Sequence, residues 1–524
     1  MSGMFETKQD KASRKLARTE KEKKAKRKTR TITILVISVL LVLSSAAILI
    51  NSNFIRRSVP VVTIDGVGFN AAEFEYFFNT QLHEYLNMMQ QFQGMGGNMP
   101  DRSRPLSHQI FNPETGETWA DILTAGALSN MTEIVSIYKA AVAYGFKLPD
   151  EQISEIENEI AMISMQAMFS GYPTTATFLQ DMYGSGMNEK IFQELLEMIS
   201  LVSSFNQHKR ESIVYTADDL LRYYEDNKDD LDVFIYRELT VFAEYLNEED
   251  FAESSEFDAA VAAALEQARA EAAMIAAGIL DEEGFLEAAA EYEIFYSDPE
   301  YTFFMTQGER LSQDINAWLL DPARGFGDIT IIDSEHGSRI IFFVSRENNR
   351  YNTVGMRQIL ISRPEVNPEE YLLGEIDPDF LEALEQAERE LHERAENIYS
   401  LFLAGGASEE TLIDLMQEHS DDTTPGGEYF NISKYPYQSS FAMAMKVVPE
   451  IEDWLFDESR KVGDSELIYT EAYGYHLLYF TGFGEPFFEF MADDRLRTRD
   501  HNEWLEGLTR GEPVKHAAFI LVTM

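Results

Sequence analysis

The sequence predicts an α+β protein of several domains, preceded by one apolar helix near the N-terminus. Three observations lead to this prediction: the chain has 524 residues, segments of helical periodicity alternate with short β-type runs, and one β-α-β pattern occurs twice. A single hydrophobic core rarely grows beyond about 250–300 residues, so a chain of this length should divide into domains. Its 45% hydrophobic and 12% aromatic content is typical of a globular protein.

The N-terminal 50 residues predict a membrane anchor. Residues 1–30 form a basic segment with 12 Lys/Arg and 4 Asp/Glu, and Thr31–Ile50 follows without a single charge. Twenty residues span about 30 Å as a helix, which is the thickness of a bilayer core. Because basic flanks stay in the cytoplasm, we expect a cytoplasmic tail (1–30), a single-pass anchor in the cell membrane (31–50) and an extracytoplasmic body. A cleaved signal peptide is the alternative.

Charge and cysteine content exclude several classes of function. The net charge is −47 at pH 7, and such an acidic body repels phosphate backbones, so we expect no nucleic-acid partner. The acidity serves either solubility or the attraction of basic partners. With no cysteine, the chain has neither disulfides nor thiolate metal sites. Its nine scattered histidines form no recognised ligand motif, so we expect no metal and no cofactor.

The segment 59–227 predicts a helical domain that opens with two strands. Val61–Phe69 has the pattern of a hairpin with Asp65-Gly66 as its turn, and Asn70 can cap the helix that follows. Apolar residues then recur at helical spacing. The region is rich in methionine, which either fills the core or forms a flexible apolar binding surface; these residues are Met88, Met89, Met162, Met165, Met168, Met182 and Met187.

This domain resembles the N-terminal chaperone domain of SurA/PrsA-type foldases. The resemblance is carried by the opening strand-turn-helix, by Tyr144–Glu151 (YGFKLPDE) and by Gly186–Glu189 (GMNE). Tyr215–Asn227 is similar to the linker helix that precedes the catalytic module in that family. The resemblance implies a helical domain that binds unfolded proteins.

An internal repeat divides the C-terminal half. Between Ile315–Glu335 and Ile451–Glu471, nine of twenty-one residues are identical, including the tryptophans Trp318 and Trp454. The match extends upstream to a first strand and an Ala-rich helix in each copy. We therefore expect two copies of one module, at 233–346 and 354–482. The last segment, 483–524, should pack on the N-terminal domain, with the edge strand Val61–Ile64 as its partner.

The second copy resembles the parvulin (rotamase) family of peptidyl-prolyl cis-trans isomerases over its whole length. The resemblance implies a four-stranded antiparallel sheet wrapped by helices, and partners that are unfolded or newly secreted proteins with X-Pro bonds. The motifs that carry it are Arg357–Leu360 (RQIL), His419–Asp422 (HSDD), Pro425–Phe430 (PGGEYF), Pro449–Phe456 (PEIEDWLF), Val462–Asp464 (VGD) and Tyr473–Leu478 (YGYHLL).

The same resemblance implies the site residues. His476 matches the family's second histidine position, and Asp422 matches the position of a cysteine or aspartate. Gln358 stands where the family has its first histidine. The implied proline-binding residues are Tyr429, Ile451, Phe456 and Tyr473.

Each site residue also has a purely structural interpretation. His476 is equally typical of a hydrogen-bonded histidine in a sheet, and Asp422 lies in a turn-rich stretch. Gln358 lacks the titration of an imidazole, and the first copy has Glu238 and Arg339 at the two histidine positions, so that copy is degenerate. Two functions follow: an isomerase with chaperone activity, or an inactive foldase-like chaperone or scaffold. The sequence leaves the clients and the oligomeric state open.

Overall fold

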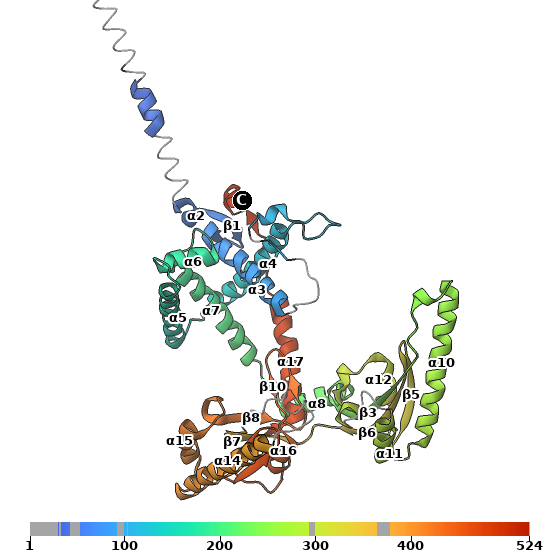
Figure 1. Ribbon diagram of the computed structural model, residues 1–524. Helices are drawn as coiled ribbons and strands as arrows, with labels where there is room; N and C mark the ends of the chain where they lie inside the picture. Colours follow the sequence, from blue (N-terminus) through green and yellow to red (C-terminus); the bar gives the residue numbers. More distant parts are fainter. Residues whose placement is uncertain are drawn as a thin grey trace, which may run out of the picture. The chain divides into compact units, whose positions relative to one another are not determined.

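The computed structural model describes residues 30, 33–41, 53–91, 99–101, 103–292, 299–363 and 378–522. Two compact units make up the chain: Met1–Ile213 with Asp500–Met524, and Val214–Arg499 (Figure 1). Both contain helices and antiparallel sheets, so the architecture is α+β.

The predicted transmembrane anchor is wrong. Among the residues that the structure describes, no helix is long and apolar enough to cross a membrane. Residues 33–41 are the described part of the predicted span, and they are helical. Residues 31–32, 42–50 and 1–29 lie outside the described part of the chain. The single-pass placement in the cell membrane depended on this anchor and is withdrawn with it.

The first unit opens with a tight hairpin. Asp65 and Gly66 both have positive φ, at 45° and 83°, as a two-residue turn of type I′ requires. Asn70 then accepts hydrogen bonds from the main-chain N–H groups of Ala72 and Glu73, which caps the next helix. The elements of this part are α2 (Phe54–Ser58), β1 (Pro60–Ile64), β2 (Val67–Asn70), α3 (Ala71–Gln91), α4 (Trp119–Tyr144), α5 (Asp150–Phe169), α6 (Thr175–Tyr183) and α7 (Glu189–Glu211).

The end of the chain completes this unit. Strand β13 (Val514–Lys515) pairs antiparallel with β1, so the sheet has the order β13-β1-β2. Phe519 packs on Phe74 with ring centroids 5.0 Å apart, and Trp504 packs on Phe205 at 6.0 Å. The edge of β1 is therefore paired by the C-terminal segment.

The second unit contains two four-stranded antiparallel sheets with the same topology. The first has the order β4-β3-β6-β5 and the second β8-β7-β12-β11, so strands that correspond along the chain occupy corresponding places. The strands of the first are β3 (Val233–Phe242), β4 (Phe303–Gln307), β5 (Ile329–Ser334) and β6 (Gly337–Glu347). The strands of the second are β7 (Asn352–Ser362), β8 (Glu428–Ile432), β11 (Ser465–Thr470) and β12 (Gly474–Pro486).

The central strand pairs agree residue by residue. Glu238 is opposite Ile341 in the first sheet, and Gln358 is opposite Leu478 in the second. Each strand pair has a β-bulge at the same place, next to Tyr236↔Phe343 in the first sheet and next to Met356↔Phe480 in the second. A bulge is a specific local feature of a strand pair, so its repetition indicates two copies of one module.

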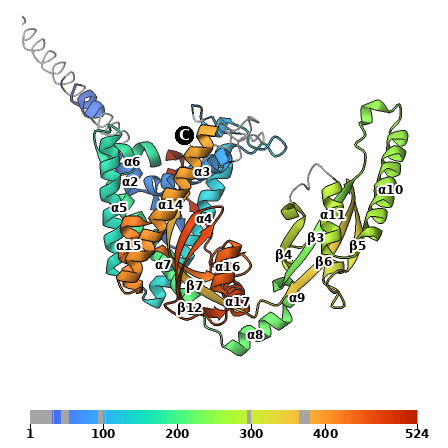
Figure 2. The same ribbon diagram turned by 60° about the horizontal axis from the view of Figure 1, so that its bottom comes forward.

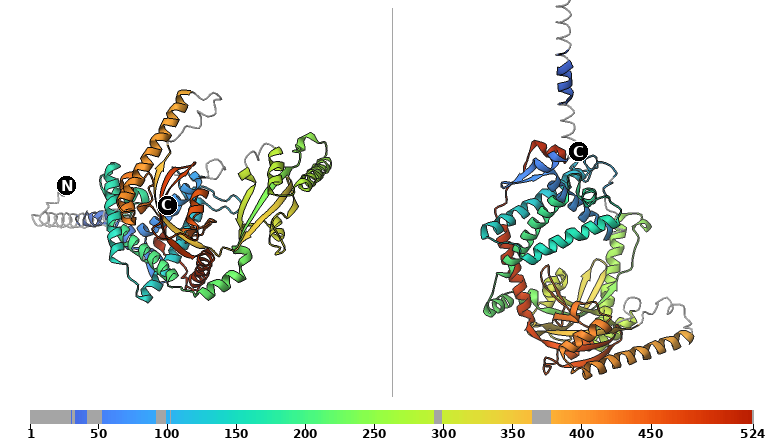
Figure 3. Two further views of the ribbon diagram at one scale, coloured as in Figure 1. Left: turned by 90° about the horizontal axis from the view of Figure 1, so that it is seen from below. Right: turned by 90° about the vertical axis from the view of Figure 1, so that its left-hand side faces the viewer.

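Helices cover both faces of each sheet. In the first module α10 (Ser254–Gly278) and α11 (Glu282–Glu291) cover one face and α12 (Gln313–Leu319) the other (Figure 2). In the second, α14 (Pro378–Ala404) and α15 (Glu409–His419) cover one face and α16 (Pro449–Leu455) the other. Figure 3 shows α14 as the long orange helix. Because side chains alternate along a strand, each central strand contributes apolar residues to both layers.

One loop is built alike in both modules, and its contacts involve four of the nine repeated residues. Arg324 lies over the ring of Trp318 and Arg460 over that of Trp454, each 4.1 Å from the ring centroid. Each arginine Nε–H also donates to the main-chain oxygen of the same tryptophan, at 3.2 and 3.0 Å. Two aspartates complete each loop as ion-pair partners of the arginine; they are Asp321 and Asp328, and Asp457 and Asp464.

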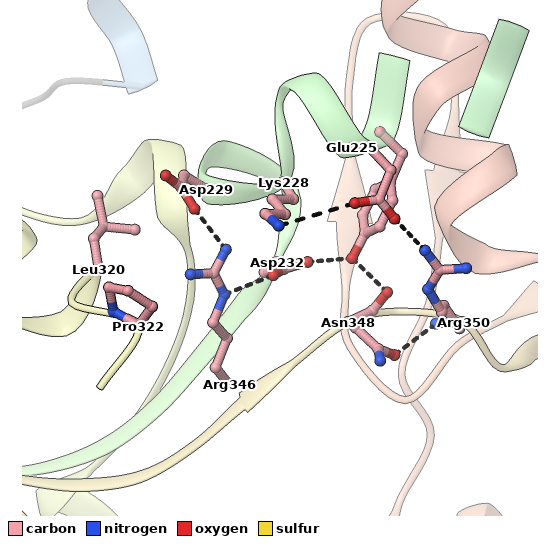
Figure 4. A pocket seen from close by; sticks show the side chains of 10 residues that line it. Glu225, Lys228, Asp229, Asp232, Leu320, Pro322, Arg346, Asn348 and Arg350 are labelled. Carbon is pink, nitrogen blue, oxygen red and sulfur yellow. Dashed lines mark hydrogen bonds and ion pairs between the residues drawn. The ribbon is translucent and has the colours of Figure 1, made fainter. Parts of the chain in front are cut away.

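A partly buried cluster of ion pairs joins the helices α8 (Ala217–Asp226) and α9 (Lys228–Leu231) to the first module. Arg346, near the end of β6, donates to Asp232 at 2.6 Å and to Asp229 at 2.7 Å. Tyr224 of α8 donates to the same Asp232, whose contact with Arg346 Figure 4 shows. Burial raises the pKa of Asp232 although these hydrogen bonds lower it. The first module is thus tied to the helices that precede it.

The repeated loop predicts a local loss of stability. We expect Arg460→Met to lower the opening free energy of the second module by about 1–3 kcal/mol, because it leaves a buried carbonyl and two aspartates without their donor. Hydrogen exchange of β12 amides measures this effect, with β6 amides unchanged. The control is Arg222→Met, at an exposed position of α8. Unchanged exchange in β12 would show that the loop is not a stabilising element.

Candidate active site

A cavity of about 290 Å³ lies on the face of the second sheet that α16 covers. The alternation of β7 places Met356, Gln358 and Leu360 on this face, and β12 adds His476. The remaining lining comes from loops and from the start of α16: Asp422, Tyr429, Met445, Lys446, Val447, Val448, Ile451 and Tyr473. The site is therefore an apolar cavity with one group of polar side chains.

The polar side chains form one continuous chain of hydrogen bonds. His476 Nδ1 is 2.9 Å from Gln358 Oε1, and Gln358 Nε2 donates to Asp422 Oδ2 at 2.8 Å. Tyr429 also donates to Asp422, at 2.7 Å. On the far side, His476 Nε2 is 3.0 Å from the hydroxyl of Thr470. Residue 358 is thus the bridge between the histidine and the aspartate.

The direction of these hydrogen bonds follows from the carboxylate. An ionised Asp422 only accepts, so Gln358 must turn its NH₂ group toward it and its carbonyl oxygen toward His476. His476 then carries its proton on Nδ1 and accepts from Thr470 at Nε2. Both ring nitrogens are therefore engaged in hydrogen bonds within the protein, and neither is free to exchange a proton with a substrate.

Burial and hydrogen bonding together set the protonation states of His476 and Asp422. Burial lowers the pKa of His476 to about 4, although the Asp422 charge raises it, and the ring is only 4% exposed. Burial raises the pKa of Asp422, but hydrogen bonds from Tyr429, the Thr424 amide and Gln358 outweigh it, so the net shift is downward. At neutral pH the site therefore holds a neutral imidazole and an ionised carboxylate.

The Gly426-Gly427 turn brings Asp422 and Tyr429 onto β7. Both glycines have positive φ, at 66° and 53°, which residues with a Cβ rarely adopt. A Cβ on Gly427 would also lie 2.5 Å from the main-chain oxygen of Gln358. The close approach of this loop to the strand therefore requires glycine.

The structure brings six of the seven residues implied by the family resemblance to one place. Phe456 is the exception, because it follows α16 and packs edge-on against Tyr351, 5.6 Å between centroids. The resemblance also missed several lining residues. Period-2 alternation around Gln358 could have identified Met356 and Leu360, whereas no pattern marks the four loop residues 445–448.

The first module has different chemistry at the corresponding positions. Thr240 is opposite Arg339 as Leu360 is opposite His476, and Glu238 takes the place of Gln358. Arg339 and Glu238 form an ion pair at 3.5 Å, and Arg339 also pairs with Asp314. Two charged side chains thus replace the neutral amide and imidazole.

Among the residues that the structure describes, no group of three or more His, Asp and Glu side chains is arranged to hold a metal ion.

Comparison with known proteins finds a distant structural neighbour. No protein-family model and no curated protein matches the chain. Among solved structures, the chain is similar to that of PrsA from Bacillus subtilis, with 15% identity over 59% of this chain and 90% of that one, and a TM-score of 0.15.

The buried imidazole predicts a specific pH dependence. We expect the NMR signals of His476 to stay constant down to about pH 5, because its pKa is lowered to about 4. Between the ordinary value of 6.5 and about 4, the unfolded chain binds a proton that the folded chain does not. The free energy of unfolding should therefore decrease as the pH is lowered through this window, by up to about 3 kcal/mol.

His476→Gln supplies the control for this titration. It should remove that part of the pH dependence and identify the imidazole signals. A His476 ring that titrates near pH 6.5 would contradict the buried, neutral state.

Proposed function

We propose that this chain is a peptidyl-prolyl cis-trans isomerase and chaperone, with its activity at the cavity of the second module. The observation that supports this most is the combination of an apolar cavity with the ordered chain His476–Gln358–Asp422–Tyr429. The partners would be unfolded polypeptides with X-Pro bonds.

The reaction needs little from the protein. Rotation about a peptide bond costs about 18–20 kcal/mol because resonance places partial negative charge on the oxygen. The apolar wall formed by Met356, Leu360 and Ile451 would take the proline out of water and disfavour that charge-separated form. The ionised Asp422 would disfavour it further by repelling the imide oxygen. His476 would act as a positioning residue that fixes Gln358 and, through it, Asp422.

Gln358 is compatible with this role. In the proposed mechanism residue 358 must donate to Asp422 and accept from His476, which an amide does with its two ends. A neutral histidine can do the same with its two nitrogens. The departure from the family pattern therefore changes the bridging group and preserves the bridge.

The chaperone part of the proposal is supported by α5. Its methionines Met162, Met165 and Met168 are 59%, 52% and 66% exposed, and Phe169 is 82% exposed, whereas Met187 is fully buried. Exposed apolar patches mark interaction surfaces, and methionine suits varied partners. If the cavity proves inactive, this surface favours the alternative, a foldase-like chaperone that only binds clients.

Isomerisation by the full-length chain is the test. NMR exchange spectroscopy on a short proline peptide measures the interconversion of the cis and trans forms without a coupling protease. We expect His476→Ala to lower the acceleration by roughly 5- to 100-fold, the cost of leaving a polar partner unsatisfied. Gln358→His should hold or raise it.

The matched control is Arg339→Ala, at the equivalent position of the first module, which should leave the rate unchanged. No acceleration by a folded wild-type chain would exclude the isomerase and leave the chaperone. A loss of activity in Arg339→Ala alone would move the site to the first module.

A further inference from the structure

The second module has another cavity, of about 370 Å³, at the other end of α16. It shares no lining residue with the proposed isomerase cavity. Its lining combines cations and aromatic rings: Arg350, Tyr351, Asn352, Lys434, Phe456, Glu458 and Phe483. This combination is unusual in a chain with 90 Asp/Glu against 43 Lys/Arg.

Lys434 is the main cation of this cavity. Its ammonium group lies 5.4 Å from the ring centroids of both Tyr351 and Phe456. Among the residues that the structure describes, no carboxylate lies within 4.0 Å of it. The neighbouring Glu452 pairs with Lys446 at 3.5 Å and also feels the charge of Lys434 over a longer distance. The Lys434 main-chain N–H donates to the Tyr351 hydroxyl at 3.1 Å, which fixes the lysine beside that ring.

The aromatic walls are held rigidly. Tyr351 stacks on Phe487 with centroids 5.5 Å apart, and burial raises its pKa, so the phenol stays neutral. Phe483 packs edge-on against Phe480 at 5.0 Å, yet remains 46% exposed. The cavity therefore offers preformed apolar surface beside a positive charge.

Arg350 contributes less charge than Lys434. It pairs with Glu225 of α8, as Figure 4 shows, and its guanidinium lies over the rings of Tyr224 and Phe488. Its positive charge is thus partly neutralised before any ligand binds. Lys434 is the group that a ligand's anion would meet.

We propose that this cavity binds a carboxylate carried beside an aromatic or large apolar side chain. The ammonium of Lys434 would pair with the carboxylate, and Phe456, Phe483 and Tyr351 would surround the side chain. A peptide has this chemistry at a C-terminal aromatic residue, or where Asp or Glu adjoins such a residue within the chain. The cavity is separate from the isomerase site, so this binding does not depend on isomerase activity.

Glu458 opposes this binding and supplies a sensitive test. Its exposed carboxylate lies in the lining of the same cavity and would repel the ligand's anion. Its replacement by a neutral amide should therefore strengthen binding. A gain of affinity cannot result from misfolding.

The experiment titrates the full-length chain with two proline-free probes, N-acetyl-Gly-Phe with a free carboxylate and its C-terminal amide, by calorimetry or NMR. We expect the free acid to bind and its amide to bind at least about tenfold more weakly, the cost of a charged hydrogen bond. Lys434→Met should weaken binding of the acid by a similar factor, and Glu458→Gln should strengthen it severalfold. The matched charge control is Lys190→Met, at an exposed site of α7, which should change nothing.

A third probe, an amidated peptide with an internal Asp-Phe pair, separates the two sources of the carboxylate. Binding of this probe would assign the cavity to acidic residues within a chain, and binding of the free acid alone would assign it to C-termini. Equal affinity for acid and amide, or an unchanged affinity in both Glu458→Gln and a folded Lys434→Met, would overturn the proposal.

Discussion

The pairing of β7 with β12 places the groups on which the candidate site depends. It brings residues 358 and 476 together although 118 residues separate them in sequence. The register puts His476 opposite Leu360, so the imidazole lies on the same face of the sheet as Gln358. A slip by one residue would turn one strand's side chains to the other face and would separate the two. The glycine turn at Gly426-Gly427 then delivers Asp422 to the end of the same face.

Burial and hydrogen bonding act in opposite directions along this polar chain. The imidazole, with two neutral partners, is kept neutral because its surroundings cannot solvate a charge. The carboxylate of Asp422 is also partly buried, but its donors stabilise the charged form. A single negative charge is therefore held at the edge of an apolar cavity. The free-energy cost of burying this charge is lowest when every partner has a fixed role as donor or acceptor. The Gln358 amide has such roles at both of its ends.

The sequence predicted local features that depend on a few neighbouring residues. The Asp65-Gly66 turn and the Asn70 cap belong to this kind, because each is determined within about ten residues. The positions of His476, Gln358 and Asp422 came from family resemblance, since contacts over such separations leave no local pattern. Phe456 does not line the same cavity as the other implied residues, and loop residues 445–448, which carry no sequence pattern, contribute to its lining. The apolar run at 31–50 and its basic flank predicted an anchor, but among the described residues no helix is long and apolar enough for one.

Residues that maintain the fold are repeated in the two modules, whereas residues that line the cavity of the second module are not. Trp318 and Arg324 repeat as Trp454 and Arg460 with nearly the same geometry, and the central strands keep the same bulge. The residues at the cavity positions differ: Glu238 and Arg339 form an ion pair in the first module, where Gln358 and His476 form a neutral hydrogen bond in the second. The charges of Glu238 and Arg339 neutralise each other, whereas the neutral Gln358 also donates to Asp422 and so fixes its orientation. Substitution of both residues together therefore preserves a folded module while it removes the polar chain, which is how one copy can lose the site and keep the fold.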